Sequence, residues 1–476
     1  MSKINIDKNR KKGFDKVLNS KDVLVTAFGA MIGWGWVVAS GDWILNAGTM
    51  GTVIGFIIGG IMIYFVGLTY AELTTAMPKC GGEHLFSYKA FGSIGSFICT
   101  WAIILSYIGV VCFEACSLPT IIQYIFPGFL QVKLYSVAGF DIYLTWLITA
   151  IIFAVLITWV NIRGIKSAAV MQTILTFVIA GVGILLIVMS TLKGDVDNLH
   201  GQFITENGMD SVVNILSIAI VAPFYLFGFD VIPQAAEEIK VPLKKLGHIM
   251  LLSIVLAVAF YSFVVIAIGI SLNSFEITES LNSSGLVAAD AMGKLFNSST
   301  MSRIAIFGGL CGIVTSWNSF LIGGSRALYS MSNAYMIPRK FCELHPKYKT
   351  PINAVILVGF LSVIAPFFGR AVLIWISNVA SFACCLAYCM VSLSFLVIRK
   401  KEPDLHRPYK VKFPKLIGVL AIIMSSFMML MYLVPFTPCT MTFAEFTIAT
   451  IWILLGFSFY KYSKNKYKDK FGNIAE

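Results

Sequence analysis

About twelve apolar runs, each close to 20 residues long, follow one another along this chain. A helix needs about 20 apolar residues to cross the hydrocarbon core of a bilayer. The composition agrees, because only 13% of the residues are charged, whereas soluble proteins carry about 25%. We therefore predict an all-α polytopic membrane protein of about twelve transmembrane helices in a lipid bilayer. The expected spans are 22–47, 49–76, 91–117, 142–162, 168–192, 212–236, 246–272, 303–336, 351–369, 372–398, 414–434 and 442–461.

The positive charges predict the orientation of these spans. Of the 36 Lys and Arg residues, 31 fall at the two ends of the chain and in alternate connecting segments. Lys and Arg concentrate on the cytoplasmic side of membrane proteins, so we expect an even number of spans in the cell membrane, with both termini cytoplasmic. The net charge of +12 then belongs to a cytoplasmic rim that attracts anionic lipid, and no nucleic-acid partner is expected. The five remaining cations are Lys133, Lys193, Lys294, Arg303 and Arg370.

Two of the spans contain residues that interrupt a helix. The first holds "GAMIGWGWVVASGDW" (29–43), with three glycines in seven residues and an aspartate. Five spans later, "VAPFYLFGFDVIPQAAEEIKVP" (221–242) holds Pro223 and Pro233 on either side of Gly228 and Asp230. Proline removes a backbone donor and clashes with the preceding turn, and lipid offers no replacement hydrogen bond. We therefore predict that spans 1 and 6 are discontinuous.

A break in a helix leaves carbonyl groups free at the end of one half and N–H groups free at the start of the other. The first end is partially negative and the second partially positive. Two breaks that face each other near the middle of the membrane would offer separate places for an ammonium and a carboxylate. Gly33 and Gly35 would let a ligand approach bare backbone. This pattern predicts a site for a zwitterionic amino acid.

Five motifs, in order along the chain, carry a resemblance to a known family. They are "GAMIGWG", "YAELTTAMPKCGGEHLFSYKAFG", "NIRGIKSAAVMQ", "FYLFGFDVIPQAAEEIKVP" and "SRALYSMSNAYMIP". Together they resemble the amino acid–polyamine–organocation (APC) superfamily of permeases, which have the LeuT-type fold. The resemblance implies a five-plus-five inverted repeat. The expected parts are a cytoplasmic tail (1–21), a first repeat (22–192), a second repeat (212–398), two further helices (414–461) and a cytoplasmic tail (462–476).

The resemblance also implies a substrate site. The N–H groups of Gly33, Trp34 and Gly35 match the turn that holds a substrate carboxylate in the family. The carbonyl groups of Met31, Phe224 and Phe227 match positions that hold the ammonium. Phe224 also matches an inner-gate aromatic, and Trp317 matches an aromatic that lines the floor of the transport route. The full set of expected substrate-binding residues is Met31, Ile32, Gly33, Trp34, Gly35, Glu114, Phe224, Phe227, Gly228 and Trp317, with Phe224 and Trp317 as gates.

Trp34 departs from the family pattern, which has a small residue at this position. Its indole could fill space and favour small substrates, or it could lie over the ammonium as a cation–π partner. It could also point away and do neither. We hypothesise that it shapes selectivity.

Two acidic residues inside the spans are candidates for coupling transport to an ion, because charges in the membrane interior are costly and usually functional. Glu114 could carry a proton or bind a substrate amine, or it could be structural. Asp230 could take part in coupling or simply cap the second half of helix 6. Near the cytoplasmic ends, a gating network or plain salt bridges are equally plausible; the charged residues there are Glu72, Glu83, Arg163, Lys166, Glu237, Glu238 and Arg326. Helix 5 lacks the lysine that replaces sodium in one family branch, so protons or exchange are favoured over sodium.

These features predict a secondary active transporter that moves amino acids by alternating access, through proton-coupled symport or exchange. The alternative is an amine or polyamine transporter that recognises a cation through Glu114 and Trp34. We expect no enzyme, because neither an H-E-x-x-H nor a G-x-S-x-G pattern occurs. No metal and no cofactor are expected.

Overall fold

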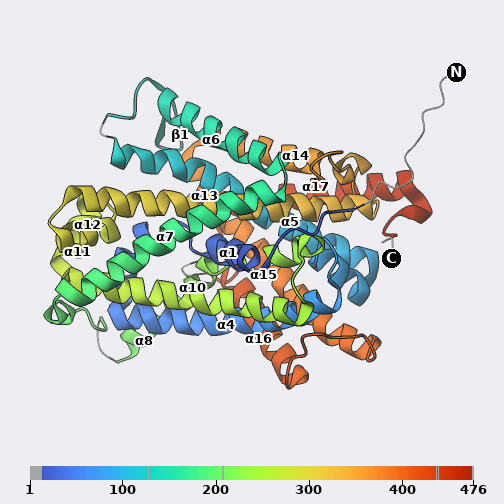
Figure 1. Ribbon diagram of the computed structural model, residues 1–476, viewed down its shortest axis with the longest axis horizontal. Helices are drawn as coiled ribbons and strands as arrows, with labels where there is room; N and C mark the ends of the chain where they lie inside the picture. The colour runs from blue at the N-terminus through green and yellow to red at the C-terminus, as the bar shows by residue number, and fades with distance from the viewer. Residues whose placement is uncertain (1–12, 127, 206–207, 436, 438, 474–476) are drawn as a thin grey trace.

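The computed structural model describes residues 13–126, 128–205, 208–435, 437 and 439–473. Of the two expected tails, residues 1–12 and 474–476 lie outside this description. The helices and strands form one elongated helix bundle (Figure 1). Their bounds are α1 (Ser20–Met31), α2 (Gly35–Val38), α3 (Ser40–Ala47), α4 (Thr49–Ala76), α5 (Glu83–Ile125), β1 (Lys133–Val137), β2 (Phe140–Tyr143), α6 (Leu144–Ile162), α7 (Ile165–Lys193), η1 (Val196–Leu199), α8 (Met209–Tyr225), α9 (Val231–Gln234), η2 (Ala236–Glu238), α10 (Leu243–Ser271), α11 (Ser274–Ser283), α12 (Val287–Phe296), α13 (Ser299–Asn333), η3 (Arg339–Cys342), α14 (Ile352–Ile364), η4 (Ala365–Phe368), α15 (Gly369–Lys401), α16 (Pro414–Met431), α17 (Phe443–Tyr467) and η5 (Lys468–Lys470).

The expected fold class is confirmed. Within the described residues, ten helical segments are long and apolar enough to cross a membrane. Two shorter apolar helices, Met209–Tyr225 and Ile352–Phe368, lie where the expected spans 212–236 and 351–369 begin. The first is short because its span breaks after Tyr225. The second includes the 3₁₀ helix η4 as its last turn and ends before Gly369, whose φ is 73°.

Both interruptions predicted from the sequence are present, and they face each other. Helix 1 stops at Met31 and resumes at Gly35, and helix 6 stops at Tyr225 and resumes at Val231. Gly228 lies between the halves of helix 6 with φ +134°, and a Cβ there would fall 2.6 Å from Ala30 Cβ. Only glycine allows this backbone conformation and this approach. The two broken segments therefore lie in contact.

Three elements of the structure were not predicted. Helix α5 begins at Glu83 rather than near residue 91, with a kink at Gly92 (φ 72°). A two-stranded antiparallel hairpin, β1–β2, joins α5 to α6. The connection 273–302 folds into two helices, and the first is started by a capping box between Asn273 and Glu276. These polar elements carry no 20-residue apolar signal, so the search for spans did not detect them.

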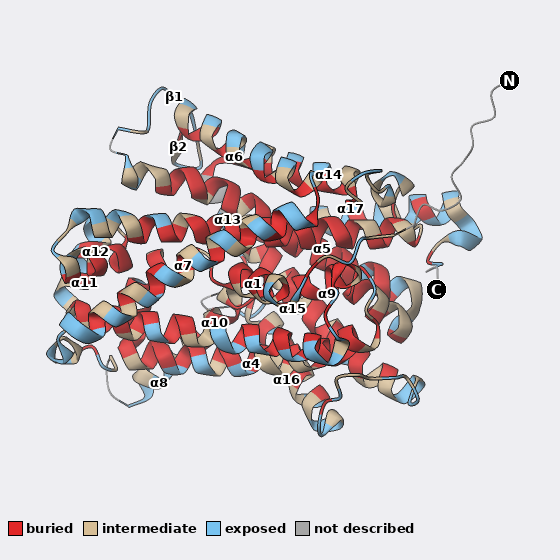
Figure 2. Ribbon diagram, viewed as in Figure 1, coloured by how far each residue is buried: buried red, intermediate tan, exposed pale blue. Residues whose placement is uncertain are grey.

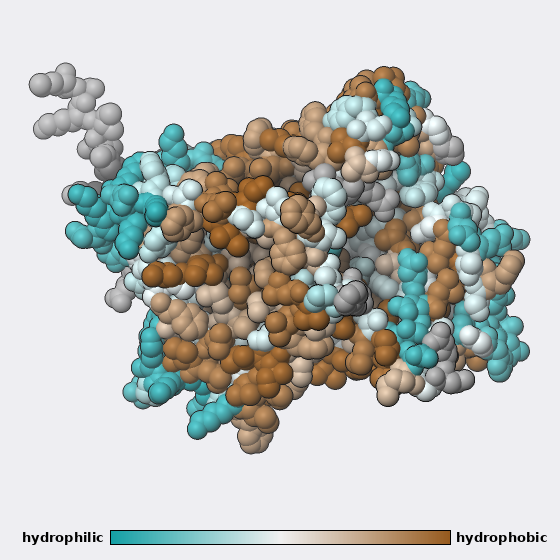
Figure 3. Space-filling model, turned by 180° about the vertical axis from the view of Figure 1, so that it is seen from behind, coloured by the Kyte–Doolittle hydropathy of each residue, from teal (hydrophilic) through white to brown (hydrophobic). Residues whose placement is uncertain are grey.

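Burial separates an inner set of helices from outer ones (Figure 2). In α5 and α13, 78% of the most apolar 18-residue stretch is buried, whereas in α17 only 11% of the corresponding stretch is buried. Glycines on α4 allow its close packing on α8, since a Cβ at Gly59 would lie 2.8 Å from Ala222 Cβ. The rear face carries a broad band of hydrophobic residues between hydrophilic ends (Figure 3), as expected of a protein surrounded by lipid.

Both ends of the described chain lie beside the C-terminal end of α13. The rings of Phe14 and Tyr329 pack edge to face at 4.8 Å, and the Gly472 amide donates to the Ala334 carbonyl at 2.8 Å. We call this end of the bundle the terminal side, and the opposite end the far side.

Candidate functional site

A cavity of about 120 Å³ lies between the two helix breaks. Residues from α1, α2, α5, α8, α10, α13 and α15 surround it, so both broken helices and four other helices meet there. Its lining consists of Ala30, Met31, Gly33, Trp34, Gly35, Val38, Val110, Phe113, Glu114, Phe224, Tyr225, Phe227, Tyr261, Ser316, Phe320 and Ser377.

The turn in helix 1 presents unpaired backbone donors. In the described part of the chain, the N–H groups of Gly33, Trp34 and Gly35 donate to no acceptor. Buried N–H groups in proteins are almost always paired, so three unpaired donors on the wall of a cavity mark a place for an acceptor from outside the chain. Gly35 also admits Tyr225, because a Cβ at Gly35 would lie 2.4 Å from that ring.

The break in helix 6 is held by Asp230. The amide of Gly228 donates to Asp230 Oδ1 at 2.9 Å, and so it does not donate to Phe224, its partner in a continuous helix. Tyr107 of α5 donates to Oδ2 at 2.7 Å, and Tyr388 of α15 donates to Oδ1 at 2.9 Å. Asp230 therefore joins three helices just below the cavity, on the terminal side.

Glu114 approaches the cavity from α5, opposite the helix 1 turn. Its Oε1 lies 3.6 Å from the position of a Cβ at Gly33, and the Ser316 Cβ lies at 3.8 Å. The side chain is 5% exposed, and among the described residues Oε2 has no hydrogen-bond partner. A buried carboxyl oxygen without a donor is costly. Glu114 is thus available to a ligand ammonium or to a proton.

Trp34 separates the cavity from the far side. A second cavity of about 80 Å³ lies on that side, and three residues line both spaces: Trp34, Val38 and Phe113. We call these three the aromatic partition. The indole of Trp34 rests on α13 at Gly309, where an added Cβ would lie 2.0 Å from Trp34 Cζ3. Trp34 lines the cavity beside the predicted ligand site and also forms its boundary.

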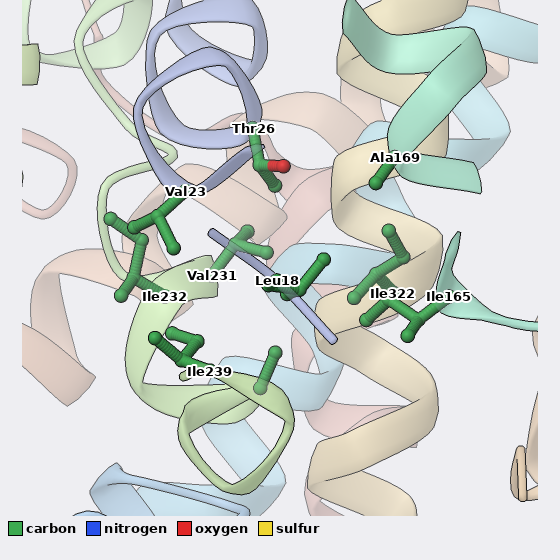
Figure 4. A pocket seen from close by; sticks show the side chains of 10 residues that line it. Leu18, Val23, Thr26, Ile165, Ala169, Val231, Ile232, Ile239 and Ile322 are labelled. Carbon is green, nitrogen blue, oxygen red and sulfur yellow. The ribbon is translucent and has the colours of Figure 1, made fainter. Parts of the chain in front are cut away.

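On the terminal side, apolar side chains pack closely around a small space. Leu18, Val231, Ile239 and Ile322 point into one space of about 10 Å³ (Figure 4), which is at the lower limit for holding one water molecule. The backbone N–H of Leu18 donates to the carbonyl of Glu238, the last residue of η2, at 3.0 Å. We call this cluster the apolar plug. It separates the cavity from the terminal side.

One ion pair near the terminal side joins two of the charged residues that the sequence analysis named there. Arg326 and Glu238 form a fully buried pair at 2.8 Å. Glu72, however, pairs with Arg399 and Arg407, at 2.5 and 3.1 Å, neither of which the sequence analysis proposed as a partner. Among the described residues, the other charged residues named there form no ion pair. The Gln234 amide donates to Glu83, the Cys80 amide donates to Glu237, and Arg163 stacks on Trp159.

The structure gathers most, but not all, of the expected binding residues around the cavity. Ile32, Gly228 and Trp317 do not line it, and Trp317 is fully buried. The Met31 carbonyl already accepts a hydrogen bond from Tyr261 at 3.0 Å. The sequence analysis missed some lining residues, including Phe113 and Ser377, because they lie outside the five family motifs. Tyr107 and Tyr388 were missed for the same reason.

Helix 5, which lacks the lysine found in one family branch, carries neutral hydrogen-bond donors that face helix 1. Gln172 and Thr176 of α7 each donate to the Val25 carbonyl, both at 3.4 Å. Ser319 of α13 donates to the neighbouring Thr26 carbonyl at 3.0 Å. These helix 1 carbonyls are therefore already met by hydrogen-bond donors.

Comparisons with known proteins identify a family and several relatives. The model of the amino acid permease family (AA_permease_2) matches residues 18–458. The chain is 26% identical to the methylthioribose transporter of Bacillus subtilis over 417 residues, 87% of each protein. It is also 26% identical to the branched-chain amino acid permease BcaP of B. subtilis, over 94% of this chain and 93% of that one. Identity to the human cystine/glutamate transporter is 27%, over 80% of this chain and 74% of that one.

Proposed function

The chain belongs to the amino acid permease family, and on this premise we propose that it carries amino acids across the cell membrane by alternating access. Its family and its relatives are membrane transporters and not enzymes. The observation that carries the proposal is the row of three unpaired N–H groups, at Gly33, Trp34 and Gly35, beside a central cavity.

The substrate would lie between the two breaks with its charged ends apart. Its carboxylate would accept from the helix 1 turn, which the positive end of α2 also favours. Its ammonium would lie near the Phe224 carbonyl, which has lost its Gly228 donor, and near Glu114. An amine without a carboxylate would leave the three N–H groups unpaired, so the geometry favours amino acids over the alternative of an amine or polyamine substrate.

The two sides of the cavity would serve as alternate gates. The aromatic partition is the thin gate, and the apolar plug with the Arg326–Glu238 pair is the thick gate, closed in this conformation. The distribution of Lys and Arg supports a cytoplasmic terminal side. Substrate would then enter past Trp34 from outside and leave when α1 and α9 separate.

Glu114 is the proposed site of proton coupling. It has a buried oxygen without a partner, whereas both oxygens of Asp230 accept hydrogen bonds from the described residues. Asp230 is therefore better suited to holding helix 6 than to exchanging a proton. Gln172, Thr176 and Ser319 already satisfy helix 1 carbonyls, which supports protons or plain exchange over sodium.

Uptake of radiolabelled amino acids into proteoliposomes tests this function. We expect accumulation that responds to an imposed pH gradient and not to a sodium gradient. An amino acid should compete for uptake better than its decarboxylated amine. In Glu114→Gln, accumulation driven by the pH gradient should be lost while exchange of internal for external substrate persists. Stronger competition by the amine would instead support the amine transporter.

A further inference from the structure

A groove of about 500 Å³ opens on the outer surface of the bundle, away from the transport cavity. It lies between α5, α15 and α17, and the last of these is the least buried of the candidate spans. Its walls are apolar and aromatic: Ile94, Phe97, Ile98, Trp101, Ala102, Leu105, Val379, Phe382, Ala383, Leu386, Ala449, Trp452, Ile453, Gly456, Phe457 and Tyr460.

The two indole N–H groups of the groove are already paired. Trp101 Nε1 donates to the Trp452 carbonyl at 2.9 Å, and Trp452 Nε1 donates to the Trp101 carbonyl at 3.1 Å. The two indoles stack at 4.5 Å between centroids. Because these N–H groups are satisfied, the groove offers contact to hydrocarbon and little to a polar ligand.

The length of the groove matches one leaflet of a bilayer. On α5 its lining runs from Ile94 to Leu105, and on α17 from Ala449 to Tyr460. Eleven residues of helix span about 16 Å, whereas the whole hydrocarbon core is about 30 Å thick. A transmembrane helix of a partner or of a second copy would need a contact surface twice as long. An acyl chain of a single leaflet fits.

Two lysines stand at the terminal-side end of the groove. Lys461 Nζ lies 4.4 Å from the ring centroid of Phe457, and Lys464 Nζ lies 5.6 Å from that of Tyr460. Both rings line the groove. Neither lysine forms an ion pair with an acidic side chain of the described residues. The groove therefore ends in two positive charges that an anionic headgroup can neutralise.

We propose that this groove is a binding site for an anionic phospholipid, with an acyl chain along the Trp101–Trp452 pair and the phosphate at Lys461 and Lys464. The site is separate from the transport cavity and does not depend on the substrate. The proposed orientation of the termini places the lipid in the cytoplasmic leaflet.

Native mass spectrometry of the full-length protein tests the site, with equal amounts of dioleoyl phosphatidylglycerol and dioleoyl phosphatidylcholine in the detergent. We expect one retained phosphatidylglycerol. Lys461→Gln with Lys464→Gln should reduce its retention by about fivefold per lysine, the contribution of one basic residue near an anionic surface. The matched control is Lys412→Gln with Lys415→Gln on and beside α16, which supplies no residue to the groove, and it should retain lipid as the unmodified protein does.

A second pair of variants tests the groove itself. Ala449→Phe should fill the groove and abolish retention. Thr450→Phe adds the same side chain one residue away, at a lipid-exposed position outside the lining, and should retain lipid. Equal retention of phosphatidylcholine, equal loss in the Lys412/Lys415 control, or a changed oligomeric state in Ala449→Phe without loss of lipid would each overturn the proposal. If Ala449→Phe fails to fold, the lysine variants decide the question alone.

Discussion

Replacing Trp34 with serine should open the aromatic partition toward the far side. The indole is 7% exposed, with one face on α13 at Gly309 and the rest facing the two cavities. A side chain of this kind buries about 150–250 Å², and we assign half of this area, about 100 Å², to the contact that closes the partition. At about 25 cal/mol per Å² this contact contributes about 2.5 kcal/mol, or about 70-fold in the ratio of closed to open partition.

A cysteine at Ser377 would report this change, because Ser377 lines the central cavity but not the far-side space. In a background without other reactive cysteines, a charged thiol reagent added outside should label Ser377→Cys at least tenfold faster when Trp34 is serine. In an uptake panel of the Trp34→Ser variant, the KM values of bulky amino acids should fall relative to those of small ones. Trp159→Ser is the control, since Trp159 is 49% exposed on the outside of the bundle. Unchanged labelling together with an unchanged substrate order would refute the assigned role of Trp34.

Three further predictions concern stability, measured as melting of the purified protein in detergent. Asp230→Asn should destabilise the protein by about 1–3 kcal/mol. The reason is that Tyr107 and Tyr388 donate to different carboxylate oxygens of Asp230, and an asparagine amide has only one oxygen to accept them. A melting temperature equal to that of the unmodified protein would contradict this role of Asp230. Glu238→Gln should cost about 3–5 kcal/mol by leaving Arg326 buried without a counter-charge. The control is Glu402→Gln, because Glu402 is 39% exposed and pairs with Lys89, which is 32% exposed. This variant should cost under about 1 kcal/mol, and equal destabilisation by the Glu238 and Glu402 variants would be inconsistent with the difference in burial. Gly59→Ala should cost about 1–3 kcal/mol by overpacking against Ala222, while Gly181→Ala, which meets nothing within 4 Å, should not destabilise, so similar melting of the two would reject close α4–α8 packing.

Local chemistry in the sequence was sufficient to predict the spans and the breaks. Hydrophobic length sets where a helix can cross lipid. The glycines around Trp34 and the prolines around Gly228 act on the backbone of their own segment, so their effect is visible without a structure. The sequence analysis considered two breaks that face each other, and the approach of Gly228 to Ala30 confirms this contact.

The partners of the polar side chains came only from the tertiary structure. Asp230 meets Tyr107 and Tyr388 across 123 and 158 residues of sequence. Glu72 selects Arg399, 327 residues away, over nearer cations. The sequence showed that Trp34 stands where the family has a small residue, but its contact with Gly309 depends on how α13 packs against helix 1. The sequence alone therefore determined where most of the apolar spans lie and where two of them break, because those properties arise within one segment. Which side chains meet depends on helix packing angles and offsets, which are set by all the helices together.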